Sequence, residues 1–223
     1  MKVYETGNIR NVVVMGHGGC GKTTLVEAIA YQTGITARMG KVTDGNTISD
    51  YDKEEQKRQF SISTSVVPVE FEDIKINFLD TPGYFDFVGE VEEACHAAGA
   101  AVIVINGKSG VEVGTLKAWE LCEKYKLPRL FFVTGMDDDQ ASYRKIVLEL
   151  NDRMDKHLNI SRDALVEAVA DTSEELMERY FAGEEFTYEE VSTALRTHVM
   201  DCQIVPVLVG SGIHNQGTSM LMN

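Results

Sequence analysis

Short runs of apolar, β-branched residues alternate with longer segments that carry apolar residues at helical spacing. Strands are predicted at residues 9–15, 63–71, 75–80, 101–105, 129–133 and 204–209. Helices are predicted at residues 22–33, 87–98, 114–125 and 142–154. This alternation favours an α/β fold with a mainly parallel six-stranded sheet flanked by helices on both faces. The segments at 63–71 and 75–80 are close enough to form a hairpin.

Two segments depart from the alternation. Residues 34–59 show no clear period and carry a charged run at residues 50–58. Because this stretch is too long for an ordinary connection, we expect a functional or mobile loop. Residues 161–200 predict two or three helices with no strand between them. No linker rich in proline or serine interrupts the chain, so residues 1–223 are predicted to form one domain.

Composition restricts the possible partners and location. A formal net charge of −14 argues against direct nucleic-acid binding, which requires a basic face. Four widely spaced cysteines, without a CxxC pair, indicate reduced thiols in a cytoplasmic protein. The apolar runs are shorter than the roughly 20 residues of a membrane span. We therefore expect a cytoplasmic monomer without membrane contact, in which Trp119 belongs to the core.

The strongest motif is GxxxxGK[ST], placed between the first predicted strand and the first helix. Its residues are Gly16, His17, Gly18, Gly19, Cys20, Gly21, Lys22 and Thr23. Such a loop directs backbone N–H groups at phosphate oxygens, and the helix N-terminus adds partial positive charge. Lys22 is predicted to reach the β- and γ-phosphates, and Thr23 to bind Mg²⁺. The alternative is a glycine-rich turn without a ligand.

Cys20 has two possible interpretations. The N–H groups around it could lower the pKa of its thiol and make it sensitive to oxidation. Alternatively, Cys20 is a small residue that fills a variable position of the loop.

A second motif, Asp80-Thr81-Pro82-Gly83, ends the third predicted strand. The carboxyl ends of parallel strands are where ligands of such sheets bind. Asp80 is predicted to hold Mg²⁺ through a water molecule. Gly83 lacks a β-carbon, so its N–H can approach the γ-phosphate. Together with the phosphate loop, this motif is typical of a P-loop NTPase that uses GTP.

The sequence resembles the translational GTPases, specifically the GTP-binding domain of elongation factor G and its bacterial paralogues. The likeness covers nearly the whole chain. It lies in the phosphate loop with Thr24 and Leu25, in residues 80–87, in residues 111–119, in residues 171–185 and in residues 205–211. The resemblance implies GTP and GDP as ligands, Mg²⁺ as cofactor, and the ribosome as a partner of the full-length protein.

The resemblance also assigns two switch segments. Switch I is about residues 34–63, and switch II is about residues 80–98. Ser61 stands where the family has a threonine, and it retains a hydroxyl that can reach Mg²⁺. Gln59 and Phe60 depart from the family pattern. The charged run at residues 50–58 could also be a solvated face.

Tyr84 departs from the family pattern as well, because most members have a histidine that orients the attacking water. A phenol with a pKa near 10 is no general base at neutral pH. Phosphoryl transfer nevertheless depends mainly on positioning and charge neutralisation. Tyrosine at this place resembles the elongation factor G paralogues, so we expect a GTPase that is slow without a partner. Lys22, Gly83 and Tyr84 are the candidate catalytic residues.

The guanine-reading motif NKxD is replaced here by Thr134-Gly135-Met136-Asp137. Asp137 remains to accept hydrogen bonds from the guanine base, and Thr134 can still donate one. Ser211 and Gly212 are predicted to complete the base loop. Without the asparagine and lysine, guanine affinity is expected to be lower. Alternatively, residues 137–139 are an acidic cluster at a helix N-terminus.

The family's inserted subdomain is expected to be absent, with a short connection at about residues 155–163 in its place. The later domains that contact RNA have no counterpart, so the chain resembles an excised GTP-binding domain that cannot perform translocation alone. Two other functions remain open. One is a non-catalytic, GTP-dependent binding module, and the other is a P-loop ATPase.

Overall fold

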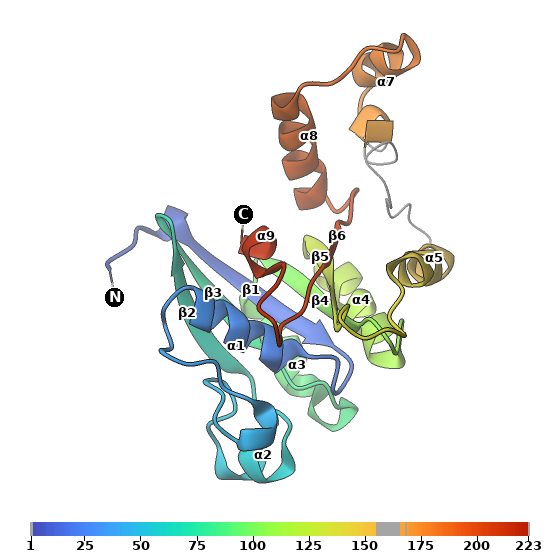
Figure 1. The fold of residues 1–223 in the computed structure, drawn as a ribbon. Coiled ribbons are helices and arrows are strands. Elements are labelled where there is room, and N and C mark those ends of the chain that lie inside the picture. The colour runs from blue at the N-terminus through green and yellow to red at the C-terminus, as the bar shows by residue number, and fades with distance from the viewer. Residues whose placement is uncertain (1, 155–165, 168, 223) are drawn as a thin grey trace.

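The computed structural model describes residues 2–154, 166–167 and 169–222. Its centre is a six-stranded sheet with the strand order β2-β3-β1-β4-β5-β6 (Figure 1). The antiparallel β2–β3 pair forms one edge, and the other neighbouring strands are parallel. The strands are β1 Ile9–Gly16, β2 Ser65–Phe71, β3 Ile74–Asp80, β4 Ala100–Asn106, β5 Arg129–Thr134 and β6 Val207–Val209. The predicted α/β fold, with its hairpin edge, is confirmed.

Helices connect the strands and cover both faces of the sheet (Figure 1). The α-helices are α1 Lys22–Gln32, α2 Lys53–Arg58, α3 Val88–Ala97, α4 Val113–Tyr125, α5 Tyr143–Met154, α7 Glu174–Phe181, α8 Tyr188–Met200 and α9 Thr218–Met222. The 3₁₀-helices are η1 Thr6–Asn8, η2 Val42–Asp44 and η3 Phe85–Phe87. In the described part of the chain, no helix is both long enough and apolar enough to cross a membrane.

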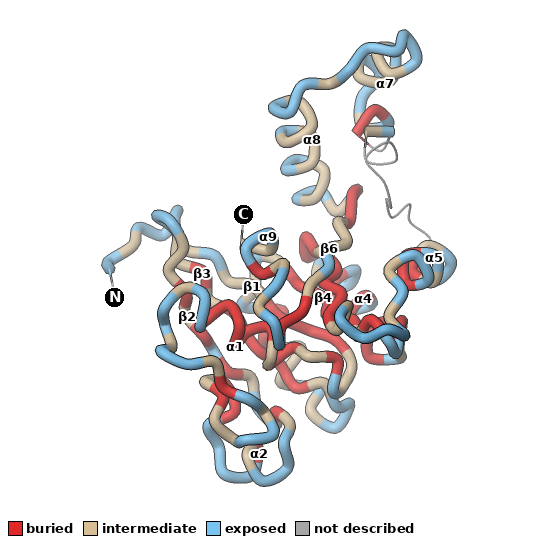
Figure 2. Tube along the Cα trace, viewed as in Figure 1, coloured by how far each residue is buried: buried red, intermediate tan, exposed pale blue. Residues whose placement is uncertain are grey.

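The core consists of two apolar layers, one on each face of the sheet. Figure 2 shows buried residues along the strands of the sheet and along the helices next to them. Side chains alternate along β4, so that Ile103 packs in one layer and Val104 in the other. One layer includes residues of α3, α4 and α5, and the other includes residues of α1 and α9. The four predicted apolar positions of α5, from Ile146 to Met154, are all buried in the first layer.

Trp119 fixes α4 against β5, as its predicted core position requires. Its ring lies nearly parallel to that of Phe131, with 5.8 Å between centroids. The guanidinium carbon of Arg129 lies 3.9 Å from the Trp119 ring centroid. Arg129 is itself 2% exposed and forms an ion pair with Glu123. The aromatic contact and the cation–π contact therefore stabilise the same helix–strand interface.

The segment expected to have no regular structure contains the short helix α2. Asp52 and Glu55 form its capping box, in which each side chain accepts a hydrogen bond from the backbone N–H of the other residue. The interpretation of residues 50–58 as a solvated face was wrong in part, because Asp50 and Glu55 are each only 3% exposed. The last strand is also shorter than predicted, since β6 begins at Val207.

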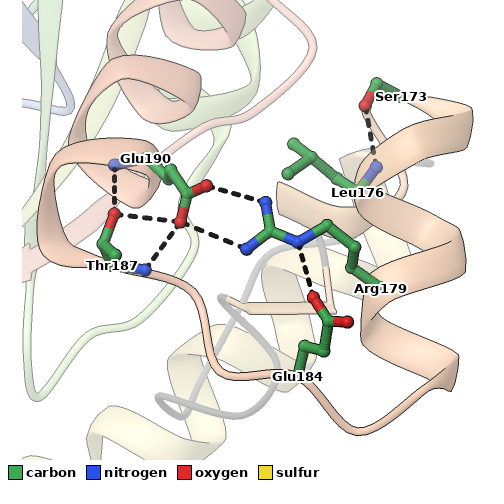
Figure 3. A network of polar contacts seen from close by, with 6 residues as sticks. All are labelled: Ser173, Leu176, Arg179, Glu184, Thr187 and Glu190. Atoms are coloured by element: carbon green, nitrogen blue, oxygen red, sulfur yellow. Dashed lines mark hydrogen bonds and ion pairs between the residues drawn. The ribbon is translucent and has the colours of Figure 1, made fainter.

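Helices α7 and α8 form a hairpin that projects away from the sheet (Figure 1). Arg179 of α7 ties the hairpin together by pairing with Glu184 at 3.0 Å and Glu190 at 2.7 Å (Figure 3). Thr187 caps α8 in a capping box with Glu190. Arg179 first, and then Thr187, lower the pKa of Glu190 to about 2. The predicted short connection at residues 155–163 lies outside the described residues.

Candidate functional site

The carboxyl ends of four neighbouring strands meet at one edge of the sheet. These ends are Gly16 of β1, Asp80 of β3, Asn106 of β4 and Thr134 of β5. Beside them lies a cavity of about 200 Å³. It is lined by Gly18, Gly19, Gly21, Lys22, Thr23, Thr24, Val42, Asp50, Gln59, Phe60, Ser61, Gly83 and Tyr84. The fold therefore brings the predicted phosphate loop and both predicted switches to one cavity.

The phosphate loop takes a backbone path that requires glycine. Gly16 has φ +144°, and a β-carbon there would lie 2.4 Å from the Val104 carbonyl oxygen. Gly21, with φ +99°, is the N-cap of α1 and provides no side-chain cap. The first N–H groups of α1 consequently have no capping side chain, which leaves them available to an anion.

Lys22 lies buried across the mouth of this loop, with 6% exposure. Its Nζ donates to the carbonyl oxygens of Gly16 at 3.1 Å and His17 at 2.8 Å. Switch II packs directly on the same group, because a β-carbon on Gly83 would lie 2.4 Å from Nζ. Such a β-carbon would also lie 2.7 Å from the Gly18 nitrogen. Only glycine at position 83 permits this approach of switch II to the phosphate loop.

Two hydroxyls and one carboxylate, from Thr23, Ser61 and Asp50, line the cavity, and the buried carboxylate of Asp80 lies close to Thr23 and Asp50. Ser61 Oγ donates to Asp50 Oδ1 at 2.7 Å, and it lies 3.2 Å from Thr23 Oγ1. Because the Ser61 proton is used for Asp50, Thr23 is the donor to Ser61. Asp50 Oδ2 and both carboxylate oxygens of Asp80 are buried without a hydrogen-bond partner. This set of oxygen donors is the kind that Mg²⁺ prefers.

Burial raises the pKa of Asp80 to about 6. Ser49, Lys22 and Thr23 oppose this shift, although neither carboxylate oxygen of Asp80 makes a direct hydrogen bond. Burial also raises the pKa of Asp50, against the hydrogen bond from Ser61. Asp50 and Asp80 are thus two buried carboxyl groups with unpaired oxygens, and a bound cation would stabilise their charged forms.

Two buried glutamates fix switch I: Glu27 ties it to α1, and Glu55 ties two parts of switch I to each other. Glu27 of α1 accepts hydrogen bonds from the N–H groups of Gly40 and Ile48, both at 2.7 Å. Glu55 of α2 accepts from the N–H groups of Ile62 at 2.9 Å and Ser63 at 3.1 Å. These bonds place Ser61 beside Thr23. Neither glutamate was predicted from the sequence, although the Asp52–Glu55 spacing of a capping box could have indicated α2.

A second cavity of about 180 Å³ adjoins the phosphate loop on the side of β5. It is lined by Gly19, Cys20, Gly21, Thr24, Asn106, Thr134, Gly135, Ser211, Gly212 and Ile213. The Thr134 hydroxyl donates to the carbonyl oxygens of Cys20 at 2.7 Å and Ile105 at 3.2 Å. The hydrogen bond that Thr134 was expected to donate therefore goes to the phosphate loop.

Asp137 lies at the exposed rim of this second cavity. Ser211 is the main cause that lowers the pKa of Asp137, and His214 acts in the same direction. The imidazole Nε2 of His214 lies 3.6 Å from Asp137 Oδ2. Gly212 packs on Thr24, where a β-carbon would lie 3.2 Å from the Thr24 methyl carbon. The predicted base-loop residues Ser211 and Gly212 thus lie beside Asp137 and the phosphate loop, respectively.

The family model of the elongation factor Tu GTP binding domain matches residues 7–223. The chain belongs to this family. A crystal structure of a protein from Thermus thermophilus superimposes on it with a TM-score of 0.88 at 31% sequence identity. The match covers 96% of this chain and 39% of that protein, so the chain spans about two-fifths of that relative's length.

Within this GTP-binding domain, the two unusual switch residues contact each other. The rings of Phe60 in switch I and Tyr84 in switch II are 4.7 Å apart between centroids. Tyr84 also covers the phosphate loop, since a β-carbon on Gly18 would lie 3.2 Å from its ring. The departures at positions 60 and 84 therefore form one aromatic contact between the two switches, although nothing in the sequence links the two positions.

The structure also distinguishes between the alternatives that the sequence left open for Cys20 and for residues 137–139. Burial raises the pKa of the Cys20 thiol, and Lys22 offsets this only partly, so the interpretation as a low-pKa thiol was wrong. Cys20 is a small buried residue of the phosphate loop. The helix-terminus interpretation of residues 137–139 was also wrong, because α5 begins only at Tyr143 and has no acidic residue in its first turn.

Proposed function

We propose that this domain binds GTP and GDP with Mg²⁺ and hydrolyses GTP as the switching part of an elongation factor G-like protein on the ribosome. The observation that carries the proposal is the phosphate cavity enclosed by both switches. There, Lys22 and the N-terminus of α1 face Ser61 and Gly83 from the two switches. Positive charge on one wall and switch residues on the other suit a ligand whose terminal phosphate orders both switches.

The residues have distinct proposed roles. Lys22 neutralises charge on the β- and γ-phosphates, and the Gly83 N–H donates to the γ-phosphate. Thr23, Ser61 and Asp80 hold Mg²⁺, which when bound withdraws charge from the phosphate oxygens. Tyr84 lies 46% exposed at the cavity and would position water rather than take its proton. We expect turnover on the order of 10⁻⁴ to 10⁻² s⁻¹ without a partner.

Calorimetric titration of the nucleotide-free domain with GDP, a non-hydrolysable GTP analogue and ATP, each with Mg²⁺, tests the binding part. We expect micromolar affinity for the guanine nucleotides and far weaker binding of ATP. Binding of ATP more tightly than GTP would favour the ATPase alternative. Absence of binding by all three would contradict the proposal.

A non-catalytic binding module is the second candidate. The observation that favours it is Tyr84, whose ring contacts Phe60 and provides no base for water. Phosphate release should be followed over many turnovers, with and without ribosomes, on the full-length protein. Stimulated release supports the GTPase. Guanine-nucleotide binding without release in either condition supports the module.

A further inference from the structure

The base cavity includes a polar side chain outside the guanine-reading motif. Asn106 is the last residue of β4 and pairs in register with Thr134 of β5. Asn106 lines the same cavity as Thr134, Gly135 and Ser211. Asn106 therefore lies at the base cavity, on the strand next to β5. It is beside Thr134 and Gly135, which stand where NKxD has its asparagine and lysine.

Local hydrogen bonds fix the orientation of the Asn106 amide. Its Oδ1 accepts from the backbone N–H groups of Lys108 at 3.0 Å and Ser109 at 3.2 Å. A flipped amide would place an NH₂ group against two N–H donors, so the oxygen must occupy this position. The amino nitrogen Nδ2 lies on the side of Gly135, because a β-carbon on Gly135 would lie 3.5 Å from it.

This amino group is an available donor. Within the described ranges, Nδ2 of Asn106 has no protein acceptor. The nearest alternative donor, the Thr134 hydroxyl, has its single proton engaged by the Cys20 and Ile105 carbonyl oxygens. Gly135 contributes no side chain. Among these side chains at the strand ends, only Asn106 presents free N–H hydrogens to the cavity.

We propose that Asn106 is a specificity-determining residue, whose amide NH₂ donates to the O6/N7 edge of the guanine base. This inference rests on the proposed binding of guanine nucleotides and deepens it. Guanine presents two adjacent acceptors on that edge, whereas adenine replaces O6 with an N6–H₂ donor. Because N7 is an acceptor in both bases, it is the bond to O6 that favours guanine over adenine, in addition to the contribution of Asp137 from the opposite edge.

Two substitutions test the role. Asn106→Asp keeps the size of the side chain and the oxygen that accepts from Lys108 and Ser109, but it replaces the NH₂ with an acceptor. Asn106→Ser keeps a hydroxyl for the turn and is too short to reach the base. Asn8→Asp, at an exposed position, is the control for the added charge. Thermal unfolding of each variant checks that it is folded.

The readout is the calorimetric Kd for GDP and for ADP, each with Mg²⁺. We expect both Asn106 variants to weaken GDP binding about tenfold, the loss of one hydrogen bond. ADP binding should not fall with it, so the preference for GDP over ADP shrinks. GDP binding within twofold of wild type in both variants, or a loss confined to Asn106→Asp, would overturn the assignment of Asn106 alone. A wild-type domain that binds no guanine nucleotide would overturn the proposed function as well.

Discussion

The phosphate half and the base half of the site are built in different ways. The phosphate half carries the complete motif, and Lys22, Thr23 and Asp80 are all buried. The base half departs from its motif, and Asp137 lies exposed at the rim. Phosphate binding depends on backbone N–H groups and one fixed path of the chain, so few different sequences can build this half of the site. A base edge can be recognised by any correctly placed donor or acceptor, and neighbouring strands offer several.

The largest expected effect is in the phosphate half. Lys22→Ala should weaken Mg²⁺–GTP and Mg²⁺–GDP binding about 10³-fold, because two charge-assisted contacts to phosphate, each about 2 kcal/mol, are lost. Calorimetry measures the change. Lys117→Ala is the control, since Lys117 is exposed and pairs with Glu120 on α4. Unchanged affinity in Lys22→Ala would place the phosphates elsewhere.

The second effect concerns pH and Asp80 in the nucleotide-free, Mg²⁺-free domain. The folded pKa of Asp80, about 6, lies above its ordinary value of 3.8. Between these values the folded state binds more protons than the unfolded state. The free energy of unfolding therefore falls as pH rises from about 4 to about 6, by at most about 3 kcal/mol from this group.

Asp80→Asn should remove that part of the pH dependence and raise stability at pH 7.5. Urea unfolding at pH 4.5, 6 and 7.5 measures the difference from wild type. Asp73→Asn, in the exposed β2–β3 turn, is the matched control. If the free energy of unfolding depends on pH equally in wild type and in Asp80→Asn, the pKa of Asp80 is not raised in the folded state.

The third effect is in the base half. Asp137→Asn should weaken GDP binding about 30-fold, or about 2 kcal/mol, because an acceptor facing the N1–H and N2–H₂ donors becomes partly a donor. The same variant should gain affinity for xanthosine diphosphate, whose base has an oxygen at that place. Asp139→Asn is the exposed control. If Asp137→Asn binds GDP as tightly as Asp139→Asn and wild type do, the base does not lie against Asp137.

The smallest expected effect concerns the part of switch I that borders the phosphate half of the site. Glu55→Gln should weaken the hydrogen bonds to the Ile62 and Ser63 N–H groups and cost about 1 kcal/mol of local order. Hydrogen exchange of residues 59–63 should accelerate, and the GTP analogue should lose more affinity than GDP. Glu54→Gln is the control, because Glu54 is exposed and pairs with Arg58. Unchanged exchange in Glu55→Gln would show that other contacts hold switch I.

The fold and the phosphate loop were predictable from sequence because both depend on local patterns. Strand runs, helix periods and the GxxxxGK[ST] spacing are each contained in a short window. The contacts of Glu27 with Gly40 and Ile48 were not predictable, because nothing local to Glu27 distinguishes it from a solvent-facing helix residue. The same holds for Asn106, which meets Thr134 only through strand pairing.

Trp119 is the single tryptophan of the chain, and its burial between Phe131 and Arg129 has an optical consequence. Its emission should change strongly when the domain unfolds. It contributes to the α4–β5 packing and lines neither of the two cavities of the nucleotide site. Intrinsic fluorescence is therefore a reporter of unfolding and a poor reporter of ligand binding. A tryptophan placed at position 60, against Tyr84, would supply the signal of switch closure that the native chain lacks.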